Sequence, residues 1–415
     1  MQRRDFIKIS TITGATAALD SCGQPDVQLI RFIPEEELTP GVATWKPSIC
    51  TLCPAGCGTL VKVIEGDAEV IRNGHLGLIK MGLAKKIEGN PNHPINQGKL
   101  CPRGQAMLQV TYHPDRIKNP LKRTGPRGSG QFQEISWEDA IKEVVGKIAE
   151  LKSKQQASSL AFLTKPARGL RRELIERFLA ALGAPPAIPF EPFDDAVLRK
   201  ANEMSLGRAQ LATPDLAHSN YVVSFGADFL GTWNSPVAQS IAYGAMRNGR
   251  PGLRGKFVQV EPRISLTAAS ADEWIPIRPG TEGVLALGLA HVMLQEKLVT
   301  SPAKEPAGKL IAGWPEGLLE YGPALVEAHT GVPASTIVRL ARELANAGGA
   351  SAIIGGAPLA QSNGLFNALA VNALQGLLGG SGNGNQFSAV GFTPVRLATG
   401  TASSASASPV QGNFS

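Results

Sequence analysis

The sequence predicts an α/β protein, in which a small β-rich domain precedes doubly wound parallel-sheet domains of the Rossmann-like kind. Short apolar strands alternate with helices from residue 136 onward, an order that forms parallel sheets flanked by helices. The strands are expected at 160–163, 221–225, 256–260 and 351–354. Earlier in the chain, residues 59–71 alternate like a β-hairpin, with a turn expected at 65–67.

The helices between these strands are recognised by apolar residues at helical spacing. Ser136 is a suitable N-cap for the first of them, because its hydroxyl can accept a hydrogen bond from the first turn. The helices are expected at 137–153, 168–182, 284–298 and 363–378.

Composition agrees with a folded protein of two or three domains, because 43% of the 415 residues are hydrophobic. The net charge is +7. Lys and Arg are scattered rather than interleaved with aromatic residues, which argues against nucleic acid as a partner. A diffuse positive charge suits an anionic cofactor or an acidic partner.

Four cysteines form the most informative motif. Cys50, Cys53 and Cys57 are spaced C-x2-C-x3-C, and Cys101 follows in a separate loop. Four thiolates are the ligand set of one 4Fe–4S cluster. Structural zinc sites more often pair two short knuckles, and two disulfides would suit an exported protein. The spacing favours the cluster over both alternatives.

The sequence around the fourth cysteine resembles the N-terminal cluster domain of the molybdopterin (bis-MGD) oxidoreductases, which include formate dehydrogenases, periplasmic nitrate reductases and polysulfide reductases. The segments that carry the resemblance are 86–104, 112–123 and 135–140. The segments 235–247 and 260–263 look most like polysulfide-reductase-like proteins and the large periplasmic subunit of alternative complex III. The resemblance spans about 45–395, omits the family's C-terminal domain, and implies a 4Fe–4S cluster and a molybdopterin guanine dinucleotide carrying Mo or W.

The expected cofactor-binding residues lie in loops that follow strands or precede helices, where parallel sheets bind ligands and where backbone N–H groups favour an anion. The resemblance assigns two of these loops to the guanosine end of the pterin, although Asp usually stands where this chain has Glu261 and Glu282. The structural alternative for each loop is an ordinary turn. The cofactor-binding residues are Gly226, Asp228, Glu261, Arg263, Arg278, Gly280, Thr281 and Glu282.

Two residues are candidates for catalytic roles. Arg103 matches the family's basic residue between cluster and pterin, and its alternative role is a salt bridge to a buried carboxylate. Asp194 is the nearest candidate for the metal ligand that the family supplies from this loop, and the alternative is an N-cap for a helix that begins at Ala196.

The N-terminus resembles a twin-arginine export signal, with Arg3 and Arg4 before a short, weakly apolar run. Residues 19–22 resemble a lipobox, which would acylate Cys22; the alternative is a chance cysteine. The run is too short to span a membrane. We therefore expect the protein in the periplasm or at the outer face of the cytoplasmic membrane, held there by its complex or by lipidated Cys22.

The expected domain order is a signal at 1–22, a linker at 23–44, a 4Fe–4S domain at 45–130 and two α/β domains. The first α/β domain combines 131–185 with 346–395, the second covers 186–345 and resembles a nucleotide-binding domain, and 396–415 is a disordered tail.

Two functions remain open from the sequence. One is an exported iron–sulfur subunit of a molybdopterin-family oxidoreductase, which passes electrons between a substrate or pterin site and a ferredoxin-like iron–sulfur subunit, with an integral-membrane quinone-reactive subunit as a further partner. The other is a non-catalytic redox or scaffold subunit of an alternative complex III-like, quinol-oxidising membrane complex without molybdenum. Little molybdenum-dependent activity is expected from the isolated chain.

Overall fold

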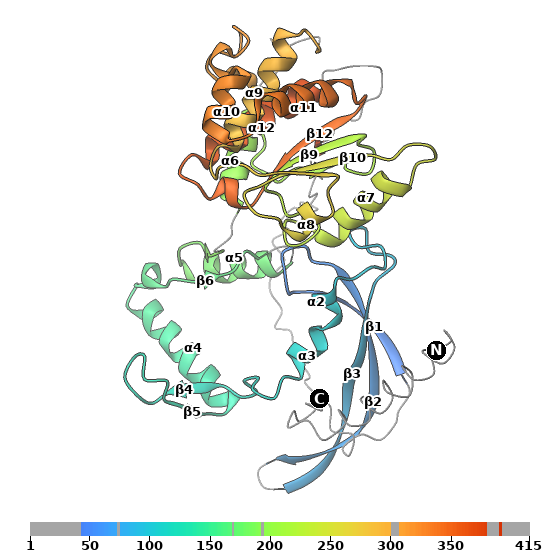
Figure 1. Ribbon diagram of the computed structural model, residues 1–415. Coiled ribbons are helices and arrows are strands. Elements are labelled where there is room, and N and C mark those ends of the chain that lie inside the picture. The colour runs from blue at the N-terminus through green and yellow to red at the C-terminus, as the bar shows by residue number, and fades with distance from the viewer. Residues whose placement is uncertain are drawn as a thin grey trace, which may run out of the picture.

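The computed structural model describes residues 43–72, 75–167, 170–191, 195–299, 307–379 and 390–391 (Figure 1). Several predictions fall outside these ranges and are not tested by the structure. They concern Arg3, Arg4, Cys22, Asp194 and the tail at 396–415.

The first domain is built on an antiparallel sheet in the order β1-β2-β3, followed by two short helices. Its elements are β1 (Ala43–Ile49), β2 (Gly58–Arg72), β3 (His75–Gly89), α2 (Pro102–Gln105) and α3 (Met107–Thr111). The turn expected at 65–67 is wrong, because β2 continues through it and Gly66 pairs with Met81 in the middle of the β2–β3 ladder. The long ladder satisfies the backbone groups of both strands, which outweighs the local turn preference of Glu-Gly-Asp.

A connecting lobe follows, and Figure 1 shows it beside the first domain. Its elements are β4 (Leu121–Arg123), β5 (Phe132–Glu134), α4 (Trp137–Ser153), β6 (Leu163–Thr164), α5 (Leu170–Leu182) and β7 (Ile188–Pro189). The N-cap of α4 is confirmed, since Ser136 Oγ accepts from Asp139 N at 3.0 Å. The buried strand expected at 160–163 is wrong: β6 begins at Leu163, whose side chain is exposed, and pairs with the two-residue strand β7.

The second half of the described chain forms a parallel four-stranded sheet in the order β11-β10-β9-β12. The strands are β9 (Tyr221–Phe225), β10 (Lys256–Val260), β11 (Glu273–Ile275) and β12 (Ala350–Ile354). Alternate side chains enter opposite cores: Val223 and Val258 pack on one side, Val222 and Phe257 on the other. Both faces are covered, as is usual for a parallel sheet.

Helices flank this sheet on both sides (Figure 1). Helices α9 and α12 are apolar around most of their circumference because both lie inside the core, whereas α11 buries one stripe. The helices are α6 (Ala196–Leu206), α7 (Pro236–Asn248), α8 (Leu266–Ala269), α9 (Glu282–Gln295), α10 (Pro323–Thr330), α11 (Ala334–Asn346) and α12 (Gly364–Gly379). A minor antiparallel pair joins β8 (Thr213–Pro214) to β13 (Val390–Gly391).

The position of β12 differs from the expected domain grouping. Residues 346–395 were expected to join 131–185, but β12 pairs in parallel with β9, from Ala350↔Tyr221 to Ile354↔Phe225. All five residues of β12 are buried. A strand that is apolar on both faces needs a place inside a covered sheet, and the β9 edge provides it.

No helix in the described parts of the chain has both the length and the apolarity that crossing a bilayer requires.

Candidate functional site: the cysteine loops and the carboxyl edge of the sheet

The four cysteines lie together in one apolar cluster. Cys50 and Cys57 are buried, and Cys53 and Cys101 pack against them. The first loop is closed by a hydrogen bond from Cys50 N to Cys57 O at 2.8 Å. Gly56 allows the bend, since its φ of +61° lies in the left-handed region that favours glycine.

Asn96 joins the first cysteine loop to the loop that carries the fourth cysteine. Its Oδ1 accepts from Gly58 N at 2.9 Å, and its Nδ2 donates to Gly58 O at 2.9 Å and to Lys99 O at 2.7 Å. The Asn96 side chain is fully buried. Sequence reasoning missed this residue, although it stands inside the motif that precedes Cys101.

The electrostatics of the site favour a cationic core. Burial, together with repulsion from the neighbouring Cys53, Cys50 and Cys101, raises the pKa of the Cys57 thiol to about 11. Burial also raises the pKa of Cys50. Four adjacent thiolates therefore require compensating positive charge, which iron supplies when it displaces the thiol protons.

The two alternatives to a cluster fit less well. All four cysteines have free thiols, so none of them forms a disulfide. Among the described residues, no three His, Cys, Asp or Glu side chains are placed to hold a single metal ion. An iron–sulfide core is larger than one ion and spreads its ligands more widely. Four thiolates, three from one short loop and the fourth from a separate loop, are the ligand set of a 4Fe–4S cluster, whereas structural zinc sites more often pair two short knuckles.

Arg103 reaches from the cysteine loop to the α/β domain. Its guanidinium Nη2 donates to the backbone oxygen of Gly231 at 3.3 Å. The alternative role, an ion pair with a buried carboxylate, does not occur among the described residues. Apart from this contact the side chain of Arg103 is exposed.

The loop after β9 carries Gly226 and Asp228. Gly226 has φ +67°, and a Cβ there would lie 2.5 Å from the Pro358 ring. Both Asp228 oxygens are used inside the protein: Oδ1 accepts from Thr267 Oγ1 at 2.6 Å and Oδ2 accepts from Thr232 Oγ1 at 2.9 Å. Asp228 therefore shapes the loop rather than presenting a free carboxylate.

The two expected site residues in the loop after β10 have different environments. Glu261 is buried, and its carboxylate accepts from Ser265 N at 2.7 Å and from Gln259 Nε2 at 3.0 Å, which commits it to holding the loop. Arg263 is exposed and makes no ion pair or hydrogen bond within the described residues. Its guanidinium is therefore available to an anionic ligand.

The expected residues in the segment before α9 are held by contacts within the protein. Arg278 Nη1 donates to the backbone oxygens of Ala328 and His329, at 2.5 Å and 3.2 Å. Gly280 has φ +83°, and Thr281 Oγ1 donates to Arg278 O at 2.7 Å. These contacts make the segment a rigid turn at the start of α9.

Glu282 is the first residue of α9 and is only 1% exposed. Burial raises the pKa of its carboxyl, against the lowering effect of backbone hydrogen bonds. Its Oε2 has no hydrogen-bond partner within the protein. A side chain enclosed in this way does not reach the surface of the loop.

The loop after β12 was not among the expected site residues, although its Gly355-Gly356 pair was visible in the sequence. It lies beside the β9 loop, because a Cβ on Gly355 would be 2.4 Å from Trp233 Nε1. The chain order reverses between β9 and β12. Parallel sheets bind ligands at such a switch point, outside the carboxyl ends of the strands.

Helix α7 begins close to both parts of the site. Val237 and Ile241 pack with the cysteines. Ser235 Oγ and Gln239 Oε1 are buried without a hydrogen-bond partner in the protein. Unpaired buried polar atoms are unfavourable unless a ligand or water satisfies them. The start of α7 therefore suits a polar ligand.

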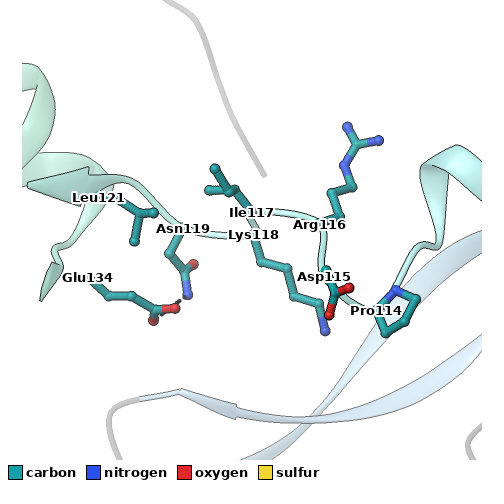
Figure 2. Close-up of a pocket in the computed structure, with 8 residues that line it drawn as sticks. All are labelled: Pro114, Asp115, Arg116, Ile117, Lys118, Asn119, Leu121 and Glu134. Carbon is teal, nitrogen blue, oxygen red and sulfur yellow. Dashed lines mark hydrogen bonds between the residues drawn. The ribbon is translucent and has the colours of Figure 1, made fainter. Parts of the chain in front are cut away.

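A separate open hollow of about 360 Å³ lies on the connector between α3 and β4. Figure 2 shows its lining side chains, including Asn119, which donates to Glu134 Oε2 at 3.1 Å. Lys118, Arg116, Asp115 and Glu134 give it mixed charge. None of the expected site residues lines it, so it is distinct from the carboxyl edge of the sheet.

Asp194 lies outside the described residues, so its assignment stays a prediction. Its neighbour Asp195 occupies the N-cap position of α6, which begins at Ala196 as expected.

Comparisons with known proteins match both parts of the chain. Residues 43–113 match the molybdopterin oxidoreductase Fe4S4 domain, and residues 116–412 match molybdopterin oxidoreductase. Together they support both cofactors expected from the sequence, a 4Fe–4S cluster and a molybdopterin.

Among curated relatives, the molybdopterin-binding-like subunit of menaquinone reductase from Nitratidesulfovibrio vulgaris is 30% identical over 388 residues, which cover 91% of this chain and 51% of the relative. The thiosulfate reductase molybdopterin-containing subunit of Salmonella typhimurium is 30% identical, covering 74% of this chain and 37% of that protein. Dimethyl sulfoxide reductase of Escherichia coli is 27% identical, covering 92% of this chain and 49% of that protein. The chain thus spans about half the length of these relatives or less.

Among solved structures, acetylene hydratase from Pelobacter acetylenicus aligns with a TM-score of 0.55 and 23% identity, covering 81% of this chain and 43% of that one. This likeness confirms the fold class.

Proposed function

Because the chain belongs to the molybdopterin oxidoreductase family, we propose that it is the cluster-bearing part of an exported oxidoreductase. It would transfer electrons between a pterin site at the carboxyl edge of the β9–β12 sheet and a partner iron–sulfur subunit. The observation that carries this proposal is the contact from Arg103 Nη2 to Gly231 O at 3.3 Å. It joins the cysteine loops to the loop after β9, the two places where the cofactors are expected.

When bound, the cluster supplies a one-electron carrier and the pterin holds molybdenum or tungsten. The chain's own residues prepare both sites. The four thiols bind iron, and Asn96 keeps their two loops together. The positive charge of Arg103 stabilises negative charge added to the cluster or carried by the pterin.

Two groups of the protein remain available to bind the phosphates of the pterin cofactor. The exposed guanidinium of Arg263 can form bidentate hydrogen bonds to a phosphate. Helix α7 has no acidic residue in its first turn, so its N-terminal N–H groups also favour an anion. Asp228, Glu261 and Arg278 act by shaping the loops around these groups.

Export by the twin-arginine route, a place at the outer face of the cytoplasmic membrane, and partners of the ferredoxin-like and quinone-reactive kinds complete the proposal. Their support is the pattern at Arg3 and Arg4, the lipobox-like segment that ends at Cys22, and the resemblance described above.

A second function is a redox or scaffold subunit without molybdenum. It is favoured by the similarity over 388 residues to a subunit described as molybdopterin-binding-like. The internal use of both Asp228 oxygens and of the Glu261 carboxylate agrees with it, because fewer groups remain for a nucleotide.

Metal analysis separates the two functions. The protein is purified from its native host together with its partners, and iron, molybdenum and tungsten are measured per chain. Molybdenum or tungsten near one per chain supports the oxidoreductase, and iron without either supports the scaffold. Absence of iron would contradict both.

A further inference from the structure

Thr267 is a buried residue of α8 that connects the loops after β9 and β10. Its side chain is fully enclosed, with 0% exposure. Its hydroxyl donates to Asp228 Oδ1 at 2.6 Å and accepts from Leu230 N at 3.2 Å. One hydroxyl therefore holds two points of the β9 loop.

Asp228 passes this restraint to Gly231. The Asp228 backbone oxygen accepts from Gly231 N at 3.1 Å and from Thr232 N and Trp233 N at 2.9 Å each. A Cβ on Gly231 would lie 2.3 Å from Asp228 Oδ2, which shows how closely the carboxylate packs against this glycine. The Gly231 peptide is consequently held by the side chain and the backbone of Asp228.

Gly231 is also the residue whose carbonyl accepts from Arg103. We propose that Thr267 is a positioning residue for Arg103: through Asp228 it fixes the Gly231 carbonyl, and that carbonyl fixes the guanidinium beside the cysteine site. This inference rests on the proposed role of Arg103 between cluster and pterin. Thr267 itself contacts neither cofactor site.

The physical reason lies in the freedom of Arg103. An exposed arginine loses considerable rotamer entropy when it is held in one place, and a single hydrogen bond of 3.3 Å is a weak restraint. A fixed acceptor adds no ordering cost of its own to that of the arginine. The effect of the charge on the cluster depends on distance, so a mobile guanidinium would stabilise the reduced, more negative cluster less.

The test uses the full chain purified with its native partners, and measures the midpoint potential of the cluster by an anaerobic redox titration with electron paramagnetic resonance. Arg103→Gln should lower the potential because a positive charge is removed. Thr267→Val should lower it in the same direction by less. Thr267→Ser, which keeps the hydroxyl, should restore the wild-type potential. In the Arg103→Gln background, Thr267→Val should cause no further shift of the midpoint potential.

Thr330→Val is a matched control. Thr330 is also fully buried, and its hydroxyl also both donates and accepts, to Val326 O at 2.7 Å and from Val332 N at 3.1 Å, but it belongs to the end of α10. The Thr330→Val variant should therefore leave the midpoint potential of the cluster unchanged. Iron content and thermal unfolding are recorded for every variant, and Thr267→Ala replaces Thr267→Val if the apolar methyl disturbs folding.

The outcomes are distinct. If Arg103→Gln shifts the potential while Thr267→Val and Thr267→Ala do not, the positioning role is overturned and the proposed function stands. An undiminished Thr267→Val shift in the Arg103→Gln background also overturns it, because the effect would then bypass Arg103. If Arg103→Gln leaves the potential unchanged, the role of Arg103 in the proposed function fails, and the inference fails with it.

Discussion

Arg247 and Asp272 form a two-pronged ion pair that ties the last turn of α7 to the segment before β11. Arg247 Nη2 donates to Asp272 Oδ1 at 2.8 Å, and Nη1 donates to Oδ2. Asp272 Oδ2 also accepts from Phe257 N at 2.7 Å. Since Val237 and Ile241 on the same helix pack against the cysteines, this pair helps to anchor the helix beside the proposed cluster.

Asp272→Asn should destabilise the protein by about 3 kcal/mol, because it leaves the guanidinium of Arg247, which is 8% exposed, without its counter-charge. Urea unfolding followed by circular dichroism measures the loss. The matched control is Glu296→Gln, which breaks the more exposed Arg342 pair and should cost much less, because solvent screens that pair. Equal losses in both variants would contradict the assignment.

The same pair predicts a dependence of stability on pH. The hydrogen bond from Arg247 lowers the pKa of Asp272 below its ordinary value, despite the opposing effect of burial. A carboxyl whose pKa is lowered on folding contributes stability above its unfolded pKa of about 3.9, and that contribution is lost as the pH falls through the folded pKa. Asp272→Asn should therefore flatten part of the acid limb of the stability curve. An acid limb of unchanged slope would argue against the pair.

Replacing any one of Cys50, Cys53, Cys57 and Cys101 with Ser should abolish the visible absorption and the paramagnetic signal of the reduced cluster, because a 4Fe–4S cluster requires all four thiolates. Iron content, optical spectra and paramagnetic resonance of the purified variants measure this. Cys22 lies outside the cluster set, so the Cys22→Ser variant is the control and should retain the iron content of the unmodified protein. Full iron content in all four cluster variants would refute the ligand assignment.

Asn96→Leu should also reduce iron content, although Asn96 is not a ligand. The substitution removes the contacts with Gly58 and Lys99 and leaves the buried N–H of Gly58 without its acceptor, which costs about 1–3 kcal/mol. Asn92→Leu, at an exposed position of the same loop, should retain iron. A fully loaded and stable Asn96→Leu variant would show that the two loops do not depend on this contact.

Arg263→Gln should weaken retention of the pterin about tenfold, since a hydrogen bond from a charged donor contributes on the order of 1.5–3 kcal/mol. Pterin released from the denatured native complex is quantified by fluorescence. Arg127→Gln, which removes another exposed guanidinium in the connecting lobe, is the control. Equal pterin content in both variants would exclude Arg263 from the phosphate contact.

Replacing Arg3 and Arg4 together with Lys should trap the precursor in the cytoplasm, because the twin-arginine pathway recognises the arginine pair. Cell fractionation followed by immunoblotting measures this, with a Lys8→Arg variant as a control that keeps the pair. Efficient export of the double-lysine variant would refute this route.

The sequence by itself determined those features that depend on neighbouring residues. The cysteine spacing indicated the ligand set, the alternation of apolar runs located β9, β10 and β12, and Ser136 marked the start of α4. Each of these signals lies within a few positions along the chain, where propensity and capping act.

Only the tertiary structure decided features whose partners are distant in the sequence. Pairing with Tyr221–Phe225 placed β12 in the parallel four-stranded sheet. Pairing with His75–Gly89 continued β2 through the turn that its sequence suggests. Glu261 and Asp228 look like open carboxylates in the sequence, but hydrogen bonds within the fold commit their oxygens. The physical reason is that backbone and side-chain polar groups must be satisfied wherever the fold buries them, and the partners that satisfy them are chosen by position in space.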